Sequence, residues 1–203
     1  MIDYLVIVPI SYLLGSIPFG LIAGKLVKNV DIRSYGSGTT GMTNVLRTVG
    51  VPAAALVLML DIGKAALAVV VAKVLFDSNG AEVAAALTVL VGHNWPVFVR
   101  FRGGRGTASG LGGLLILSPI SGLIAALIGV AVIAITRYVS LGSIAATTLG
   151  SLAIIVLAAT GHAPMVYTGF GAIAGLLVLA SHRDNIQRLI RGTERKLGQR
   201  AEI

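Results

Sequence analysis

The sequence predicts an all-α integral membrane protein, and three observations lead to this class. Of the 203 residues, 56% are hydrophobic and only 12% are charged, with a mean hydropathy of +0.92. A water-soluble domain carries about twice that share of charge. Long apolar segments recur between short polar loops, and each is close to the roughly 20 residues that a membrane helix needs. We expect residues 1–203 to form a single membrane-embedded domain.

Seven segments are apolar enough to be helices within the membrane. In chain order they cover residues 4–24, 51–76, 82–99, 106–117, 120–136, 140–160 and 163–180. The first two are long enough to cross a bilayer, whereas the fourth reaches only about 18 Å of a hydrocarbon core of about 30 Å. We expect the fourth segment to be a partial span that protein shelters from lipid.

Ser118-Pro119 decides the number of spans, because residues 106–136 could form one kinked helix or two. With a turn there, seven spans place all 16 lysines and arginines except Lys64 and Lys73 on one side. Six spans would put the basic residues of 183–200 opposite those of 100–105, against the cytoplasmic bias of positive charge. We therefore predict seven helices, some short or partial, with the N-terminus outside and the C-terminus cytoplasmic.

The first polar motif follows the first apolar segment. It reads Gly-Ser-Gly-Thr-Thr-Gly-Met-Thr-Asn over residues 36–44, and Arg47 follows it. Glycines allow backbone N–H groups to converge on an anion, and the arginine adds positive charge. A flexible loop that caps a helix has the same composition. Composition alone favours neither interpretation.

The second motif reads Gly-His-Asn-Trp-Pro over residues 92–96 and Arg-Phe-Arg-Gly-Gly-Arg-Gly-Thr-Ala-Ser over residues 100–109. Glycines before a helix, with Arg105 among them, can present N–H groups and a guanidinium to a phosphate. The two earlier arginines could instead be anchors at the membrane face, and Gly106 and Gly110 are spaced for close helix packing. Neither alternative explains two adjacent glycines directly before Arg105.

The third motif reads Ser-His-Arg-Asp-Asn-Ile over residues 181–186, followed by Arg188, Gly192 and Glu194. His182 and Asn185 are three residues apart, so one helix face can present both to a ligand at the membrane surface. The alternative is an amphipathic surface helix without a ligand. We expect the tail of residues 182–203 to contain a short surface helix in either case.

Two ionisable residues interrupt the second apolar segment. Asp61 and Lys64 are three residues apart, so they can neutralise each other on one helix face. His93 is interpreted as a structural bridge between helix ends, and His162, on the outer side, is given no role.

These motifs bring Arg47, Arg105 and Arg183 with His182 to one face of the membrane. They predict a site for phosphorylated ligands that arrive from the cytoplasm, the lipid or both. The chain has no cysteine, which excludes disulfides and thiolate metal sites. We predict no metal and no cofactor. We also predict no nucleic-acid partner, because membrane topology already explains the net charge of +8.

The order and spacing of these motifs resemble those of the PlsY family, the bacterial acyl-phosphate:glycerol-3-phosphate acyltransferases. The resemblance rests on residues 14–20, 36–47, 92–93 with 96–98, 101–106, 137–141, 182–183 and 185–186. Arg105 stands where the family usually has lysine, Thr39 where it has asparagine and Met42 where it has alanine. Ala108-Ser109 stands where the family has Ala-Thr.

The resemblance implies an enzyme that moves a fatty acyl group from acyl phosphate to the 1-hydroxyl of sn-glycerol 3-phosphate. The products would be 1-acylglycerol 3-phosphate (lysophosphatidate) and phosphate, in the first acylation step of bacterial phospholipid synthesis. The resemblance also implies a multi-pass protein of the bacterial inner membrane, in contact with membrane lipid, with its site on the cytoplasmic side.

The resemblance further implies which residues form the site. The catalytic residues would be Arg47, Arg105, His182 and Asn185. The substrate-binding residues would be Ser37, Gly38, Thr39, Thr43, Asn44, Gly103, Gly104, Ser143 and Arg183.

Two other classes of function remain at this point. A transporter for a phosphorylated anionic metabolite would use the same basic cluster, but it needs a polar path across the membrane. The spans offer few polar residues beyond Asp61 and Lys64. A scaffold that recruits lipid enzymes would leave the clustered glycines unexplained.

Overall fold

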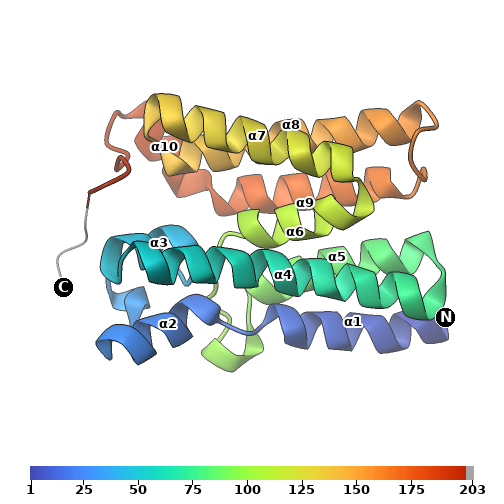
Figure 1. The fold of residues 1–203 in the computed structure, drawn as a ribbon, viewed down its shortest axis with the longest axis horizontal. Helices are drawn as coiled ribbons and strands as arrows, with labels where there is room; N and C mark the ends of the chain where they lie inside the picture. Colours follow the sequence, from blue (N-terminus) through green and yellow to red (C-terminus); the bar gives the residue numbers. More distant parts are fainter. Residues whose placement is uncertain (200–203) are drawn as a thin grey trace.

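The computed structural model describes residues 1–199. The only regular secondary structure in these residues is helical. The longer helices are α1 (Ile2–Gly15), α4 (Val51–Phe76), α5 (Asn79–Asn94), α6 (Thr107–Leu117), α7 (Pro119–Thr136), α8 (Val139–Ala159) and α9 (Tyr167–Ser181). Figure 1 shows these helices running along the long axis of the molecule. The shorter elements are α2 (Phe19–Lys28), η1 (Ile32–Ser34), α3 (Met42–Thr48), η2 (Val97–Val99) and α10 (Arg183–Ile190).

Within the described residues, five helical segments are long and apolar enough to cross a membrane. They cover Ile2–Lys28, Val51–Phe76, Asn79–Val99, Pro119–Thr136 and Val139–Ala159, while Thr107–Leu117 and Tyr167–Ser181 are shorter apolar helices. The predicted all-α membrane protein is therefore confirmed. Ser118 and Pro119 form the predicted turn, since the Ser118 side chain caps the start of α7.

The first apolar segment is not one continuous helix, contrary to the prediction for residues 4–24. The chain leaves helical geometry after Gly15, and Pro18 precedes α2. A proline has no N–H to donate and disfavours helix at the residue before it. The break lets α2 continue toward the end of the molecule that also holds α3 and α10 (Figure 1).

Glycines allow several of the long helices to approach closely. A side chain at Gly112 on α6 would collide with the Ile62 carbonyl of α4, and one at Gly15 on α1 would collide with the Val89 carbonyl of α5. Lipid is as apolar as the side chains of these helices, so the hydrophobic effect does not drive the helices together. Close packing at small residues does so instead. Gly110 differs, because its added Cβ would meet only Val178, at 3.9 Å. The interpretation of Gly110 as a close-packing position was wrong.

The tail beyond α9 is helical only through Ile190. Gly192 then adopts a positive φ of 69°, and the following residues run in an extended course that returns to α3 and to the α7–α8 turn. The expected surface helix is therefore short, and it continues into a strap, residues 191–199. Arg200, which the sequence grouped with the basic face, lies outside the described residues.

Candidate functional site

The three polar motifs meet at one cavity of about 220 Å³ at the end of the molecule that carries α2, α3 and α10 (Figure 1). Thr39, Thr43 and Arg47 reach it from the first motif, Arg105 and Thr107 from the second, and His182, Asn185 and Glu194 from the third. These residues are far apart in the sequence, and the helices bring them together. The structure confirms the prediction that the three motifs converge on one site.

Asn44 holds the first motif in shape. Its side chain is fully buried, and its Nδ2 donates to the carbonyls of Ile32 (2.7 Å) and Thr39 (2.8 Å). Its Oδ1 accepts from the Ser37 N–H at 3.0 Å. All of its donors and its acceptor are thus directed at the loop, so Asn44 positions Thr39 and does not face the cavity itself.

The two adjacent glycines of the second motif pack against His93. The Gly104 N–H donates to the His93 carbonyl at 3.0 Å, and a side chain at Gly104 would overlap the His93 ring. The Gly103 carbonyl accepts from the Thr40 N–H at 3.2 Å, which ties the second motif to the first. This close approach explains both glycines, and it delivers Arg105 to the cavity wall.

His182 is buried at the end of α9, and its ring has a defined orientation. Its Nδ1 lies 2.8 Å from the Val178 carbonyl. A carbonyl only accepts hydrogen bonds, so Nδ1 carries the proton and Nε2 has a free lone pair in the neutral ring. Burial lowers the pKa of His182 and the nearby Arg105 lowers it further, although the Val178 carbonyl opposes this. The ring is therefore neutral at pH 7.

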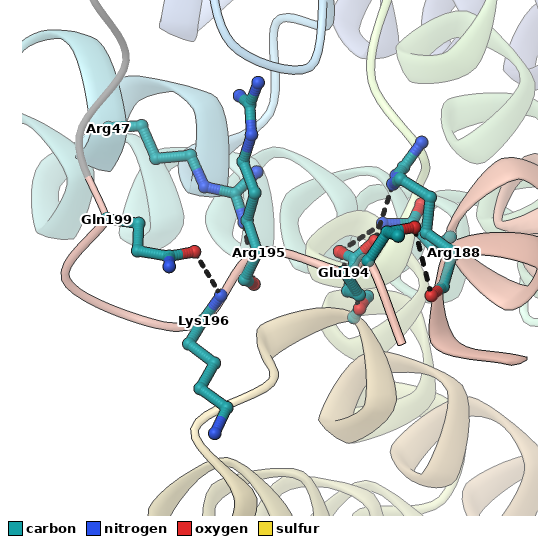
Figure 2. A network of polar contacts seen from close by, with 9 residues as sticks. Arg47, Arg188, Glu194, Arg195, Lys196 and Gln199 are labelled. Carbon is teal, nitrogen blue, oxygen red and sulfur yellow. Dashed lines mark hydrogen bonds and ion pairs between the residues drawn. The ribbon is translucent and has the colours of Figure 1, made fainter. Parts of the chain in front are cut away.

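Glu194 organises the third motif from within the strap. Its carboxylate accepts from Ser140 Oγ (3.0 Å), Asn185 Nδ2 (2.8 Å) and Arg188 Nε (2.7 Å), and Figure 2 shows part of this network. Burial would raise the pKa of Glu194, but the hydrogen bonds from these three groups outweigh it and lower that pKa. Because the Asn185 amide nitrogen is bound to Glu194, the buried Asn185 Oδ1 is left without a partner among the described residues.

Two guanidinium groups lie in this poorly solvated site. Burial lowers the pKa of Arg47, and burial with repulsion from Arg188 lowers that of Arg105. Arginine stays protonated despite such shifts. Arg47 donates to the Arg195 carbonyl of the strap at 3.3 Å (Figure 2). Two half-buried cations facing one cavity favour an anionic ligand, and a phosphate offers them several acceptors.

The predicted Asp61–Lys64 pair is present, with Oδ1 and Nζ 2.8 Å apart, and both side chains are 2% exposed. The structure adds a third member, because His93 Nδ1 lies 3.4 Å from the same carboxylate oxygen. Lys64 also donates to the Ile17 carbonyl at 3.0 Å, just where the first helix breaks. Asp61 and His93 line the cavity.

The opposite part of the cavity is apolar and reaches the lipid-facing surface. Its lining includes Leu58 of α4, Leu111 of α6, and Val130 and Ile133 of α7. Val130 is 67% exposed, so this part opens at the surface of the bundle. One cavity therefore joins a cationic end to an apolar end.

The predicted site residues divide into two groups. Those that line the cavity are Thr39, Thr43, Arg47, Arg105, Ser143, His182 and Asn185. Those that do not are Ser37, Gly38, Asn44, Gly103, Gly104 and Arg183. Ser37 stays close, with Oγ 3.1 Å from Thr39 Oγ1. The Arg183 side chain is 82% exposed and lies beside Asp184, because the chain turns into α10 directly after His182.

Sequence reasoning missed some lining residues. Asp61 and His93 had been given structural roles, Glu194 had been named after the third motif but not placed in the site, and Ser140 had been covered only as part of residues 137–141. The signal for Glu194 was its position two residues after a glycine in the third motif. For Asp61, the signal was an acidic residue in an apolar span, which is rare without a function.

The sequence from residue 5 to residue 192 matches the family model described as glycerol-3-phosphate acyltransferase. The chain belongs to this family. A glycerol-3-phosphate acyltransferase of Thermoanaerobacter sp. is 47% identical over 194 residues, covering 96% of both chains. One from Halalkalibacterium halodurans is 46% identical, covering 95% of this chain and 94% of the relative. The family predicted from the motifs is confirmed.

Two solved structures share the fold. Both are of PlsY (YgiH), described as an integral membrane glycerol 3-phosphate acyltransferase. The glycerol 3-phosphate form superposes with a TM-score of 0.87 at 38% identity and covers 96% of each chain. The lysophosphatidic acid form has a TM-score of 0.85 at 37% identity and covers 97% of this chain and 96% of that one.

Proposed function

We propose that this acyltransferase moves a fatty acyl group from acyl phosphate to the 1-hydroxyl of sn-glycerol 3-phosphate. The products are 1-acylglycerol 3-phosphate and inorganic phosphate. The observation that carries the proposal is the single cavity that joins two half-buried arginines to an apolar opening. Both substrates carry phosphate, and one also carries a hydrocarbon chain. The related PlsY structures are a glycerol 3-phosphate form and a lysophosphatidic acid form, which correspond to an acceptor and a product of this reaction.

The proposed reaction is a direct attack, with no acyl-enzyme. The glycerol hydroxyl oxygen forms a bond to the acyl carbonyl carbon. The bond from that carbon to the phosphate oxygen breaks, and its electron pair leaves with the phosphate. Acyl phosphate is an activated mixed anhydride, so positioning and charge stabilisation are what the protein must supply.

We assign the roles from the contacts of each side chain. Arg105 and Arg47 neutralise the departing phosphate. Asn185 Oδ1, buried and unpaired among the described residues, accepts a hydrogen bond from the 2-hydroxyl of glycerol 3-phosphate, which leaves the 1-hydroxyl proton free for His182. His182 Nε2 takes the hydroxyl proton, since its Nδ1 proton is already directed at Val178. Thr39, Thr43 and Ser143 supply further hydrogen bonds at the cavity wall.

The remaining predicted substrate-binding residues act through their backbone or their neighbours. Ser37, Gly38 and Asn44 shape the first motif, and Gly103 and Gly104 bring Arg105 into place. Arg183, which is exposed, adds positive charge at the mouth of the site.

Membrane placement forms part of the proposal. The helices along the long axis enter a bacterial inner membrane as seven spans, with α6 a partial one sheltered by its neighbours. The N-terminus lies outside, and the end with α2, α3 and α10 faces the cytoplasm (Figure 1). Residues 1–203 form one domain, which meets glycerol 3-phosphate from the cytoplasm and acyl phosphate from the lipid between α4 and α7.

The deciding experiment uses the purified chain in proteoliposomes with acyl phosphate and glycerol 3-phosphate. We expect equal amounts of released phosphate and lysophosphatidate. Uptake of glycerol 3-phosphate without acylation would contradict the proposal and favour a transporter. Protein that carries a covalent acyl group after exposure to the donor alone would contradict direct attack. Ser140 would be the suspect nucleophile, but its partner Glu194 is a weak base because its pKa is lowered.

A further inference from the structure

A second cavity, of about 50 Å³, lies beyond the apolar part of the site. It is enclosed by α6, α7, α8 and α9, and its lining includes Gly110, Leu114, Ser151, Phe170 and Val178. We call it the deep cavity. It shares Thr107, Leu111, Ala125 and Ala146 with the site cavity, so the two cavities adjoin at these side chains.

The deep cavity extends away from the cationic end of the site. Its lining on α6 runs from Thr107, beside Arg105, to Leu114, and its lining on α9 runs from Val178, one turn before His182, back to Phe170. Seven residues of helix correspond to roughly 10 Å along the axis. The cavity therefore continues toward the membrane interior from the place where the acyl carbonyl would react.

The walls of the deep cavity suit a hydrocarbon. None of its lining residues is charged, and its polar groups are the hydroxyls of Thr107, Thr147 and Ser151. A cavity with mostly apolar walls accepts apolar groups.

We propose that the deep cavity receives the far end of the acyl chain and sets the longest chain that the enzyme uses efficiently. This inference rests on the proposed function. A methylene gains little when it moves from lipid into an equally apolar cavity, so selection is by exclusion. Chains that fill the cavity fit, and longer chains must displace packed side chains such as Phe170, which core packing resists.

Gly110 makes the proposal testable. It lines the deep cavity but not the site cavity, and an added Cβ would meet only Val178, at 3.9 Å. A larger side chain at this position therefore fills the deep cavity without colliding with backbone. Gly63, on α4, is an exposed helical glycine with nothing within 4 Å of an added Cβ, so it is a matched control.

The experiment compares kcat/KM for palmitoyl phosphate with that for octanoyl phosphate in the series Gly110→Ala, Gly110→Val and Gly110→Leu. We expect the palmitoyl-to-octanoyl ratio to fall progressively, by about tenfold or more in Gly110→Leu, as expected when a pocket loses room for a methylene or more. Gly63→Leu should keep the wild-type ratio. Val178→Ala, which enlarges the cavity, should raise the ratio of stearoyl to palmitoyl phosphate.

Unchanged ratios throughout the Gly110 series, with an active wild type, would overturn the inference and leave the acyl chain in lipid. The same holds if Gly63→Leu shifts the ratio as much as Gly110→Leu does. A wild-type enzyme that makes no lysophosphatidate from any acyl phosphate would instead overturn the proposed function, and this inference with it. The two failures are therefore distinguishable.

Discussion

Arg105 stands where the family usually has lysine, and the geometry of the site accounts for an arginine there. The half-buried Arg105 lines the same cavity as Arg47, where the leaving phosphate is proposed to lie. Lysine would keep the charge but present it as a point rather than a planar fork. The longer arginine reaches the cavity from a turn that two glycines press against His93.

We predict that Arg105→Ala lowers kcat by about a hundredfold to a thousandfold, as expected for the loss of one preorganised donor to a developing charge. Arg105→Lys should retain most of the activity, because the charge remains. Phosphate release measures both. Arg102→Ala is the matched control, since this exposed arginine does not line the cavity and should leave the rate unchanged.

His182 gives a prediction about pH. Its folded-state pKa is lowered, so the neutral ring persists below the ordinary histidine value of about 6.5. We expect kcat/KM to be flat from about pH 8 to that value and to fall only at lower pH. The unfolding free energy should fall in the same window, because the buried ring resists protonation. His182→Ala should lose nearly all activity while folded. A fall in kcat/KM that begins above about pH 6.5 would contradict the assignment of His182 as the proton acceptor.

At the scale of elements, α4 carries an ion pair where a membrane helix would normally carry none. Lys64 neutralises Asp61, holds the Ile17 carbonyl at the α1–α2 break and lies over the Phe19 ring. The Ile17 carbonyl also accepts from the Phe19 N–H at 3.2 Å, so Lys64 is its second donor at a point where water is scarce. The pair therefore joins α4 to the point where the first segment bends.

Lys64→Met should destabilise the protein by about 3–5 kcal/mol, because it leaves the Asp61 charge buried and uncompensated. The double substitution Asp61→Asn with Lys64→Met should recover part of this loss. Thermal unfolding in detergent measures both. If the double variant is no more stable than the single one, the pair is not what stabilises this bend.

The strap is the second element with a consequence of its own. Glu194 accepts hydrogen bonds from Asn185 and Ser140, and Leu197 exchanges hydrogen bonds with Arg137. The Arg195 carbonyl accepts from Arg47 (Figure 2). These contacts connect α10 with α3 and with the α7–α8 turn across the mouth of the site.

Glu194→Ala should lower the rate by about tenfold to a hundredfold, because the Asn185 amide loses the partner that orients it. It should also cost about 1–3 kcal/mol of stability through unpaired buried groups. Assay and thermal unfolding together check this. Lys196→Ala is the control, because that exposed side chain only lies over the Tyr138 ring and should change neither quantity appreciably.

At the scale of the whole molecule, sidedness can be tested because the chain has no cysteine of its own. Ala163→Cys lies in the α8–α9 loop, and Lys28→Cys lies at the end of α2, at the opposite end of the molecule (Figure 1). We expect a membrane-impermeant maleimide to label Ala163→Cys in intact spheroplasts and Lys28→Cys only after lysis. The reverse pattern would overturn the proposed orientation.

Periodicity and hydropathy placed most helices, and in particular cases they placed them well. The segment at 51–76 coincides with α4, and the turn at Ser118-Pro119 separates α6 from α7. The break between α1 and α2 was missed because residues 4–24 are uniformly apolar, and hydropathy does not register a kink. The strap was missed because Glu194 looks like any charged tail residue until its three donors are in place.

The sequence by itself determined that the protein lies in a membrane, where most of its helices are, which loops carry the basic residues and which family it belongs to. These depend on composition and on local motifs, which the chain carries wherever its parts are placed. Tertiary structure alone decided that Asn44 supports a loop whereas Asn185 faces the cavity, that Asp61 meets His93, and that Gly110 borders empty space. These outcomes depend on which side chains compete for the same donors and volume, and packing of distant helices sets that competition.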